Sequence, residues 1–426
     1  MSTIKIYSYE TGNVPWVAVD RGHLGTKQAE GSMFGIVLIS ISTMMHIYVF
    51  WRAATVPFVH RHVPLPVLIG AGVVLWIIFY LGRVVGHHGT GVPAAALEFI
   101  GMNWMAMLFL TFVPLLAVDL ITAFGWLMPR LALSLRGLAL AAGVVLSAIA
   151  LFQGLRPPVV QSYEVRLSSL SDEIDGTVIV ALSDMHLGSL LGERWLAARV
   201  AQVNAQQPDL VVLLGDIFEG HGPPSKELTR TLGRLSAPLG VWAVPGNHEF
   251  YGGYGKRMGP IEDAGFQVLR NRWVEVRPSL VLAGVEDFTA RHRSGQSGDI
   301  ISQTLALRPP GATVLLSHTP WQAEKASQAG ASLMLSGHTH GGQIWPFSYL
   351  VRRVYPLLEG RYEVDGMTAI VTRGTGTWGP RMRLWHPGEI LRVTLKKKKV
   401  IQRLNSKKSL ASFCPQHFFV YFTHGS

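Results

Sequence analysis

The feature that most limits the fold of this 426-residue chain is a long stretch that carries almost no charge. Between residues 33 and 153 only seven side chains are charged: Arg52, Arg61, Arg83, Glu98, Asp119, Arg130 and Arg136. The surface of a soluble domain needs far more charged groups than this. Together with 48% hydrophobic residues overall, the stretch indicates a helical membrane region.

The stretch divides into four apolar runs, at residues 33–51, 64–82, 99–128 and 137–153. A bilayer core of about 30 Å takes about 20 helical residues, so we predict about four spans. The third run is long and contains Pro114, which favours a tilt or a kink. Asp119 and His46 are ionisable groups within the runs, and such groups are costly at membrane depth and often functional. Basic residues flank both sides, so the orientation in the membrane stays open.

The composition predicts five segments: an N-terminal segment (1–32), transmembrane helices (33–153), a linker (154–162), a globular domain (163–395) and a basic and aromatic tail (396–426). The first segment has charged residues before any apolar run, which is the wrong order for a cleaved signal peptide. The tail has seven Lys and Arg and no acidic residue, so it supplies +7 of the formal charge of +11. Such a tail is typical of a solvated or membrane-surface segment, and it argues against a nucleic-acid partner.

The globular segment alternates strands and helices, which predicts an α/β fold. The expected strands cover residues 177–184, 209–216, 240–247, 280–287, 312–318 and 332–338, with helices at 193–204 and 226–235. The strands are almost continuously apolar. This pattern indicates sheets that are covered on both faces.

Polar residues follow five of the six apolar strands: Asp184, His186, Asp216, Asn247, His248, His318, His338 and His340. The carboxyl ends of strands in an open α/β sheet meet at one edge, so these side chains are expected in one crevice. Any one of them alone would be an ordinary turn or surface residue. As a set, carboxylates and imidazoles suit Mn, Fe or Zn. The single cysteine, Cys414, excludes an internal disulfide and a cysteine-based zinc cage.

The motifs DxH, GD, GNHE, H and GHxH, in this order, resemble the calcineurin-like metallophosphoesterase superfamily, and its bacterial membrane-associated branch in particular. The resemblance covers residues 163–396, somewhat over half of the chain. It implies a four-layer αββα sandwich behind the helical region. It also implies a membrane-anchored hydrolase that cleaves a phosphomonoester or phosphodiester with a hydroxide bridging two divalent metal ions.

The resemblance assigns roles to the motif residues. One metal site would take Asp184, His186 and His340, the other Asn247, His318 and His338, and Asp216 would bridge both ions. His248 would contact the phosphate and protonate the leaving oxygen, while Glu249 would orient a neighbouring group. Glu219 stands where purple acid phosphatases have a tyrosine, and the second block, "GDIFEGHG", lacks the GDxxDRG of protein phosphatases. Neither a tyrosinate-bound ferric centre nor phosphoprotein specificity is therefore implied.

The segment 373–390 offers candidate substrate contacts in Arg373, Arg381 and Trp378. Arginine suits phosphate, and tryptophan suits a nucleobase or the membrane interface. Alternatively, this segment is a hairpin that closes the sheet with packed tryptophans. A phospholipid or a lipid-linked diphosphate is a candidate substrate for a multi-pass protein of the bacterial inner membrane. The alternative function is a membrane sensor or transport accessory whose phosphoesterase domain binds metal without catalysis.

Overall fold

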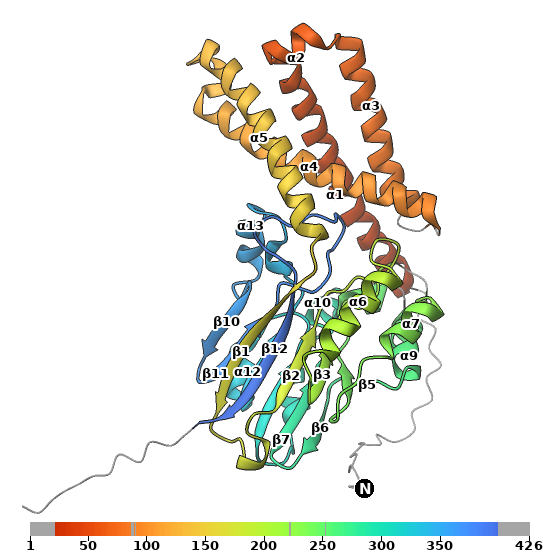
Figure 1. The fold of residues 1–426 in the computed structure, drawn as a ribbon, viewed down its shortest axis with the longest axis vertical. Helices are drawn as coiled ribbons and strands as arrows, with labels where there is room; N and C mark the ends of the chain where they lie inside the picture. The colour runs from red at the N-terminus through yellow and green to blue at the C-terminus, as the bar shows by residue number, and fades with distance from the viewer. Residues whose placement is uncertain (1–21, 87–88, 90, 221–222, 252, 399–426) are drawn as a thin grey trace, which may run out of the picture.

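The computed structural model describes residues 22–398 except 87–88, 90, 221–222 and 252, and it describes side chains from residue 35 onward. A group of long helices stands at one end of the molecule, and an α/β domain forms the other (Figure 1). The expectations for residues 1–32 and 396–426 fall largely outside the described residues.

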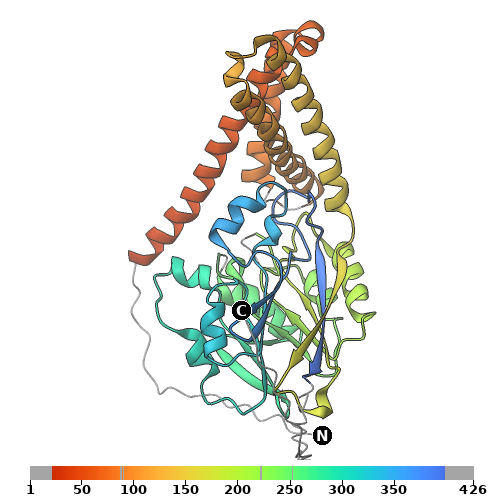
Figure 2. The same ribbon diagram turned by 90° about the vertical axis from the view of Figure 1, so that its left-hand side faces the viewer.

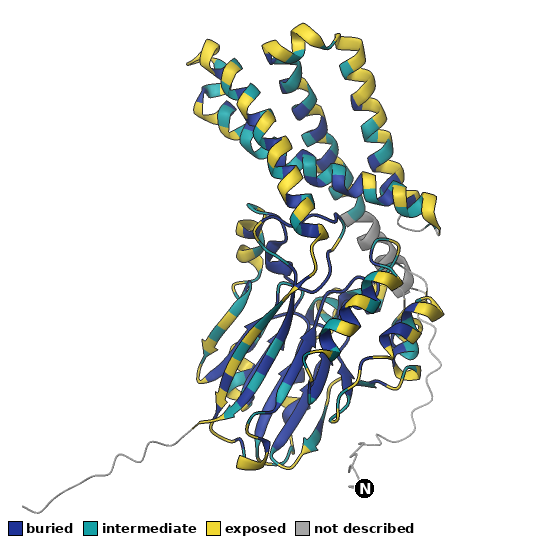
Figure 3. Cartoon of the chain, in the orientation of Figure 1, coloured by how far each residue is buried: buried dark blue, intermediate teal, exposed yellow. Residues whose placement is uncertain are grey.

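The helical part contains α1 (Gly22–Thr55), α2 (Pro57–His62), α3 (Leu65–Leu81), α4 (Val92–Ile121) and α5 (Pro129–Leu155). Four of these helices are long and apolar enough to cross a membrane, which confirms the expected number of spans. Exposed side chains surround the outside of this bundle, whereas the strands of the α/β domain are mostly buried (Figure 3). The bundle therefore presents apolar residues to its surroundings, as lipid-facing helices do.

The bounds of the last two spans differ from the expected ones. The third run was expected at 99–128, but α4 begins at Val92 and ends at Ile121. Phe124 and Gly125 have φ values of 58° and 91°, which stops the helix in a tight turn. The fourth run was expected from residue 137, but α5 already begins at Pro129, where proline fits a first helical turn. Arg136 is tolerated inside the helix because Asp119 pairs with it.

The expected linker at 154–162 is largely regular structure. Helix α5 runs to Leu155, and strand β1 (Val159–Leu167) begins four residues later. The prolines in "RPPVV" suggested a loop, but the residues after them pair along the whole length of β12 (Glu389–Lys397). The α/β domain therefore begins almost directly at the end of the last helix.

Two six-stranded sheets form the domain. The first has the order β1-β12-β2-β3-β4-β5, with β2 (Val178–Leu182), β3 (Leu210–Leu213), β4 (Val241–Ala243) and β5 (Gln267–Val268). The second has the order β10-β11-β9-β8-β7-β6, with β10 (Gly360–Val364), β11 (Met367–Val371), β9 (Leu333–Ser336), β8 (Ala312–Leu316), β7 (Leu280–Gly284) and β6 (Arg272–Arg277). All six predicted strands are present. Sequence analysis had missed the four edge strands β1, β5, β6 and β10 and the inner strands β11 and β12.

The outer face of the first sheet is covered by α6 (Glu193–Asn204), α7 (Lys226–Leu232) and α9 (Tyr254–Asp263), and that of the second by α10 (Phe288–Arg293), α11 (Ile300–Leu305) and α12 (Ala323–Gln328). The short helices α8 (Asn247–Tyr251) and α13 (Ser348–Val354) contribute no residue to these two outer cores. Val212 and Val314 belong to the core between the sheets. Leu196 of α6 and Ile301 of α11 belong to the two outer cores. This arrangement confirms the αββα sandwich, and it explains the near-continuous apolar strands.

Strand directions bring the polar strand ends toward the helical bundle. Strand β1 leaves α5 and runs away from the bundle, and β12 is parallel to it (Figures 1 and 2). Strand β2 is antiparallel to β12 and therefore runs back, with β3 and β4 parallel to β2. The carboxyl ends of β2, β3 and β4 consequently face the helical bundle.

Candidate metal centre

The polar residues that follow the strands lie on unusual backbone. Five of them have positive φ values, namely Asp184 (52°), His186 (46°), Asp216 (50°), His338 (70°) and His340 (51°). This left-handed conformation costs a non-glycine residue about 1–2 kcal/mol. Such strain persists where the surrounding structure fixes it, and it concentrates at functional sites. The turns let residues that are two apart aim at different points.

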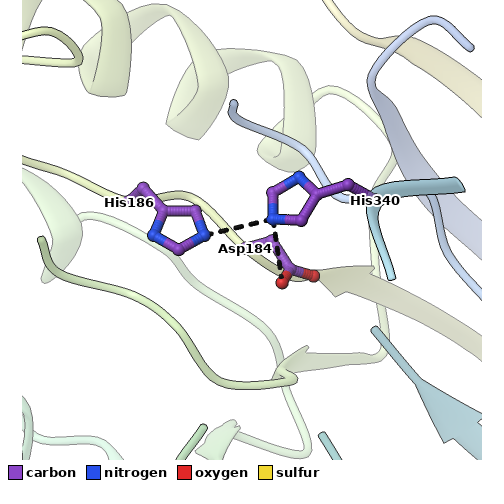
Figure 4. A group of neighbouring side chains, drawn as sticks. All are labelled: Asp184, His186 and His340. Atoms are coloured by element: carbon purple, nitrogen blue, oxygen red, sulfur yellow. Dashed lines mark hydrogen bonds and ion pairs between the residues drawn. The ribbon is translucent and has the colours of Figure 1, made fainter. Parts of the chain in front are cut away.

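The first cluster consists of Asp184, His186 and His340, whose donor atoms all lie within 4.8 Å of one another. The Nε2 atoms of the two histidines are 3.2 Å apart, and Nε2 of His340 lies 3.4 Å from Oδ1 of Asp184 (Figure 4). All three residues are buried. Two imidazoles and a carboxylate that face one another in this way could hold one divalent ion.

The second cluster consists of Asp216, His318 and His338. His318 Nδ1 donates to the carbonyl of Leu214 at 2.7 Å, which turns its Nε2 toward the cluster. That Nε2 lies 3.2 Å from His338 Nδ1, while His338 Nε2 bonds the Tyr355 hydroxyl at 2.8 Å. Both rings are thus held in fixed orientations with one nitrogen toward Asp216 or its neighbours.

Asp216 stands between the two clusters. Its Oδ2 lies 3.2 Å from Nε2 of His318 and 3.9 Å from Nε2 of His186. Its Oδ1 accepts the backbone N–H of His248 at 2.9 Å, which fixes the rotation of the carboxylate. One oxygen of Asp216 is therefore within reach of a ligand from each cluster.

Asn247 contributes an amide oxygen that has no hydrogen-bond partner among the described residues, although it is buried. Its Nδ2 donates to the Tyr251 hydroxyl at 2.8 Å, so the amide orientation is defined. A buried polar atom without a partner costs about 1–3 kcal/mol. A cation bound at this oxygen would remove that penalty, so the donor set fits a divalent metal.

Burial keeps two of the imidazoles neutral. Burial is the main cause that brings the pKa of His340 to about 3, against the opposing effect of Asp184 and with a smaller lowering by His186. Burial, followed by the nearby His318, brings the pKa of His338 to about 4. Neutral imidazole has the free lone pair that a metal ligand needs. These two side chains are therefore ready to bind a cation at neutral pH.

His248 has the opposite character. Burial lowers its pKa, but the nearby carboxylates of Glu219 and Asp216 outweigh burial and raise it to about 9. Its Nδ1 lies 3.2 Å from Glu219, and its Nε2 lies 3.9 Å from Asp216 Oδ2. His248 is thus a positively charged group at the edge of the clusters. Glu219 also contacts His186 Nδ1 at 2.6 Å, so it orients two of the histidines.

Glu249 fixes the backbone of two of the loops. Its carboxylate accepts the N–H groups of Asp216, Ile217 and Gly246 at 2.8–2.9 Å, and that of Phe218 at 3.4 Å. It is fully buried. Glu249 thus holds the backbone of the loops that carry Asp216 and Asn247.

The three expected substrate contacts occupy different positions. Arg373 pairs with Glu389, and Arg381 donates to the carbonyl of Leu190, so both guanidinium groups are bonded within the domain. Trp378 is 43% exposed, and its ring centroid lies 6.3 Å from that of His248. The geometry therefore supports Trp378 at the rim of the site, and it gives Arg373 and Arg381 supporting positions.

Sequence analysis missed two tyrosines that form hydrogen bonds with candidate ligand side chains. Tyr251 bonds Asn247, and its spacing of four residues on α8 was a usable signal. Tyr355 bonds His338 across an irregular loop and the helix α13, where no regular spacing marks the contact.

Comparisons with known proteins place the chain in a family. The calcineurin-like phosphoesterase family model matches residues 177–342. A metallophosphoesterase of Aquifex aeolicus, itself uncharacterized, is 33% identical over 56% of this chain and 92% of its own length. The chain belongs to the calcineurin-like phosphoesterase family. Proteins of this family use divalent metals, which the Asp and His clusters could bind.

Two further relatives of the family are longer than the match. An uncharacterized metallophosphoesterase of Campylobacter jejuni is 32% identical over 60% of this chain and 69% of its own length. A transmembrane protein with metallophosphoesterase domain from Bos taurus is 33% identical over 61% of this chain and 62% of its own length, which is less than two thirds. Family membership suggests hydrolase activity. The apolar helices and the transmembrane relative suggest membrane association.

Proposed function

We propose that this chain is a membrane-anchored phosphoesterase that uses two divalent metal ions to hydrolyse a phosphomonoester or a phosphodiester. The observation that carries the proposal is the position of Asp216 Oδ2 between an Asp184 cluster and a His318 cluster. Two cations held a few ångströms apart need an anionic bridge, and a carboxylate supplies one.

The proposed ligands follow the two clusters. Asp184, His186 and His340 would hold one ion, Asn247, His318 and His338 the other, with Asp216 shared. Carboxylate, amide and imidazole donors without thiolate favour Mn, Fe or Zn. When bound, such ions lower the pKa of water toward about 7 and polarise the phosphoester.

The remaining groups act on the substrate and the leaving oxygen. His248 carries a positive charge at neutral pH because Glu219 and Asp216 raise its pKa to about 9. It can therefore contact a phosphate oxygen and donate a proton to the departing oxygen. Glu219 at Nδ1 turns Nε2 of His248 toward Asp216 and the clusters.

The test uses the full chain in detergent with Mn²⁺ and a soluble aryl phosphodiester. We expect turnover by the wild type and a loss of about 10²–10⁴-fold in His248→Ala, with both ions retained. A wild type that binds two ions but turns over no phosphoester would instead favour the membrane sensor or transport accessory.

Metal analysis separates the two sites. Under the proposal His338→Ala and His340→Ala each lose one ion, and they lose different ones. The visible absorption spectrum of bound Co²⁺ depends on its ligands, so Co²⁺ spectra of the two variants would show which site each variant keeps. If both variants keep two ions and full activity, the proposed ligand sets are wrong.

For the location we propose the bacterial inner membrane. Apolar α-helices, unlike the β-barrels of outer membranes, form the four candidate spans. A membrane position makes a phospholipid or a lipid-linked diphosphate the first substrates to test. Nucleic acid is disfavoured, because residues 396–426 carry +7 of the net charge of +11.

A further inference from the structure

Helix α4 is longer than a bilayer crossing requires. Its 30 residues extend about 45 Å, whereas a bilayer core is about 30 Å thick. Residues of its first half contact the α/β domain: the Ser189 hydroxyl donates to Glu98, and Met102 packs beside Gly379. Ser189 is only three residues beyond His186. The surplus length of α4 therefore lies along the edge that carries the metal centre.

Helix α5 is joined to the same edge. The Arg383 N–H donates to the carbonyl of Ala150 at 2.9 Å, and the Trp385 N–H donates to Gln153 Oε1 at 2.8 Å. Ala150 also packs in one cluster with Ile344, which follows His340 by four residues. Backbone hydrogen bonds and a shared core fix the end of the last span against the loops of the site.

Beside this junction an apolar surface remains uncovered. It consists of Phe347, which directly precedes α13, of Tyr349, Leu350 and Val354 within α13, and of Trp385. These side chains are 45–65% exposed. We call it the α13 surface. Phe347 contacts Phe109 of α4 with ring centroids 6.0 Å apart, so the surface continues directly from the membrane helices. Trp385 contacts Trp345 at 5.0 Å.

The charges of the α13 surface favour one occupant. Arg352 and Arg353 lie exposed on the same short helix, and no acidic residue lies within it. Tryptophan and tyrosine prefer the water interface of a bilayer. Each basic residue near an anionic lipid surface contributes about 1 kcal/mol of attraction. Aromatic, apolar and basic groups in continuity with four spans match the anionic headgroup layer of the same membrane.

The α13 surface is also tied to the metal centre. Tyr355 directly follows α13 and bonds His338 Nε2 at 2.8 Å. On another side of the site, Trp378 and Tyr251 are 43% and 40% exposed and both contact the His248 ring. The groups that would meet the substrate are thus flanked by membrane-facing and aromatic residues.

We infer that the α13 surface lies in the headgroup layer of the membrane that the helices span, and that the site takes the phosphoester headgroup of a membrane amphiphile. This inference rests on the proposed phosphoesterase function. The α13 surface holds the strand ends at headgroup depth. An amphiphile can then present its phosphate to the clusters while its acyl or prenyl chains stay in the bilayer.

The first test measures depth and needs no bound metal. The sole cysteine is replaced by Cys414→Ser, and a nitroxide is attached at Leu350→Cys or at Leu307→Cys in the full chain in anionic nanodiscs. Leu307 is 78% exposed and precedes β8. It therefore lies at the end of the strands that is opposite to the metal centre, and it is the matched control. We expect the Leu350 label to be accessible to oxygen and shielded from a water-soluble nickel relaxant. Equal nickel accessibility of the two labels overturns the docking.

The second test compares substrates. Phosphatidic acid, phosphatidylglycerol and a polyprenyl diphosphate in nanodiscs are compared with soluble 4-nitrophenyl phosphomonoester and phosphodiester. We expect Leu350→Glu to lower the ratio of amphiphile to soluble turnover at least tenfold, and Leu307→Glu to leave the ratio unchanged. If the protein hydrolyses the soluble esters but none of the amphiphiles, the inference is wrong and the proposed function still stands. A metal-loaded wild type that hydrolyses neither kind removes the proposed function itself.

Discussion

Two buried clusters of charged and polar side chains, one in the helices and one at the strand ends, differ in whether their members satisfy one another. In the bundle, Asp119 is fully buried and pairs with Arg52 at 2.5 Å and Arg136 at 2.7 Å. The Tyr48 hydroxyl also donates to Asp119 at 2.5 Å. A carboxylate with two cations and a hydroxyl donor needs no further ligand.

The strand-end cluster is the opposite case. Nε2 of His186 and Nε2 of His340 face each other at 3.2 Å, and Asn247 Oδ1 has no partner among the described residues. Imidazoles, carboxylates and an unpaired amide oxygen converge there, and the positively charged His248 lies at their edge. The difference teaches that burial of charge alone does not mark a ligand site. Converging acceptors that lack donors do.

The largest expected effect comes from Asp216→Asn. Replacing the shared carboxylate removes the anionic bridge, so we expect kcat/KM for a soluble phosphodiester to fall at least about 10³-fold, or about 4 kcal/mol. Metal content measured by elemental analysis should fall from two ions toward one or none. Circular dichroism checks that the variant is folded.

The matched control is Asp119→Asn, which changes the same chemical group in the closed cluster. It should keep both ions and the activity of each folded molecule. If Asp119→Asn abolished metal binding as Asp216→Asn does, the two clusters would not be distinct in function.

Asp119→Ala should instead act on stability. It leaves Arg52 and Arg136 buried without their shared anion, a change that costs about 3 kcal/mol in the free energy of unfolding. Reversible unfolding in mixed detergent micelles, followed by the helical signal, measures the loss. An unchanged unfolding free energy would show that the pairing contributes nothing to the bundle.

Sequence patterns predicted the cores and the clusters to different degrees. Continuous apolar strands such as 312–318 and the motif residues at their ends were recoverable because burial on two faces and ligand chemistry restrict residue type strongly. Edge strand β1 was not predicted because prolines precede it. In addition, its pairing with β12 joins residues more than 200 positions apart, which no local sequence pattern reveals. Asp119 was recognised as unusual, but its two arginine partners lie on other helices and sequence spacing does not link them.

The roles of the arginines near the site were hidden for a related reason. Arg373 and Arg381 have the composition of phosphate ligands, but the carboxylate of Glu389 and the carbonyl of Leu190 engage them. A guanidinium group serves an internal carboxylate as well as it serves a phosphate. Only the three-dimensional neighbours decide between the two roles.

Metal addition should stabilise one part of the molecule only. Mn²⁺ at about one hundred times its dissociation constant raises the free energy of unfolding of the α/β domain by about 2.7 kcal/mol, if the unfolded chain does not bind it. Thermal scans of wild type and Asp216→Asn, with and without EDTA, measure the shift. The increase in melting temperature on adding Mn²⁺ should be small in Asp216→Asn. In Asp119→Asn, scanned in the same way, it should be as large as in the wild type. An equal shift in both variants would place the bound ions elsewhere.

The smallest effect separates two tyrosines with the same contact in different surroundings. Tyr355 bonds His338, and Tyr48 bonds Asp119. Tyr355→Phe frees the ring of His338 to rotate, and loss of such an orienting partner weakens metal binding about tenfold, or about 1.4 kcal/mol. Tyr48→Phe should leave metal affinity unchanged, because both arginines still hold Asp119 and only about 1 kcal/mol of stability depends on one hydrogen bond. Competition with a chelator of known affinity measures both. Equal metal affinity in Tyr355→Phe and wild type would mean that His338 is oriented without its hydroxyl partner. The contrast between the strand-end cluster and the Asp119 cluster would then rest on the carboxylates alone.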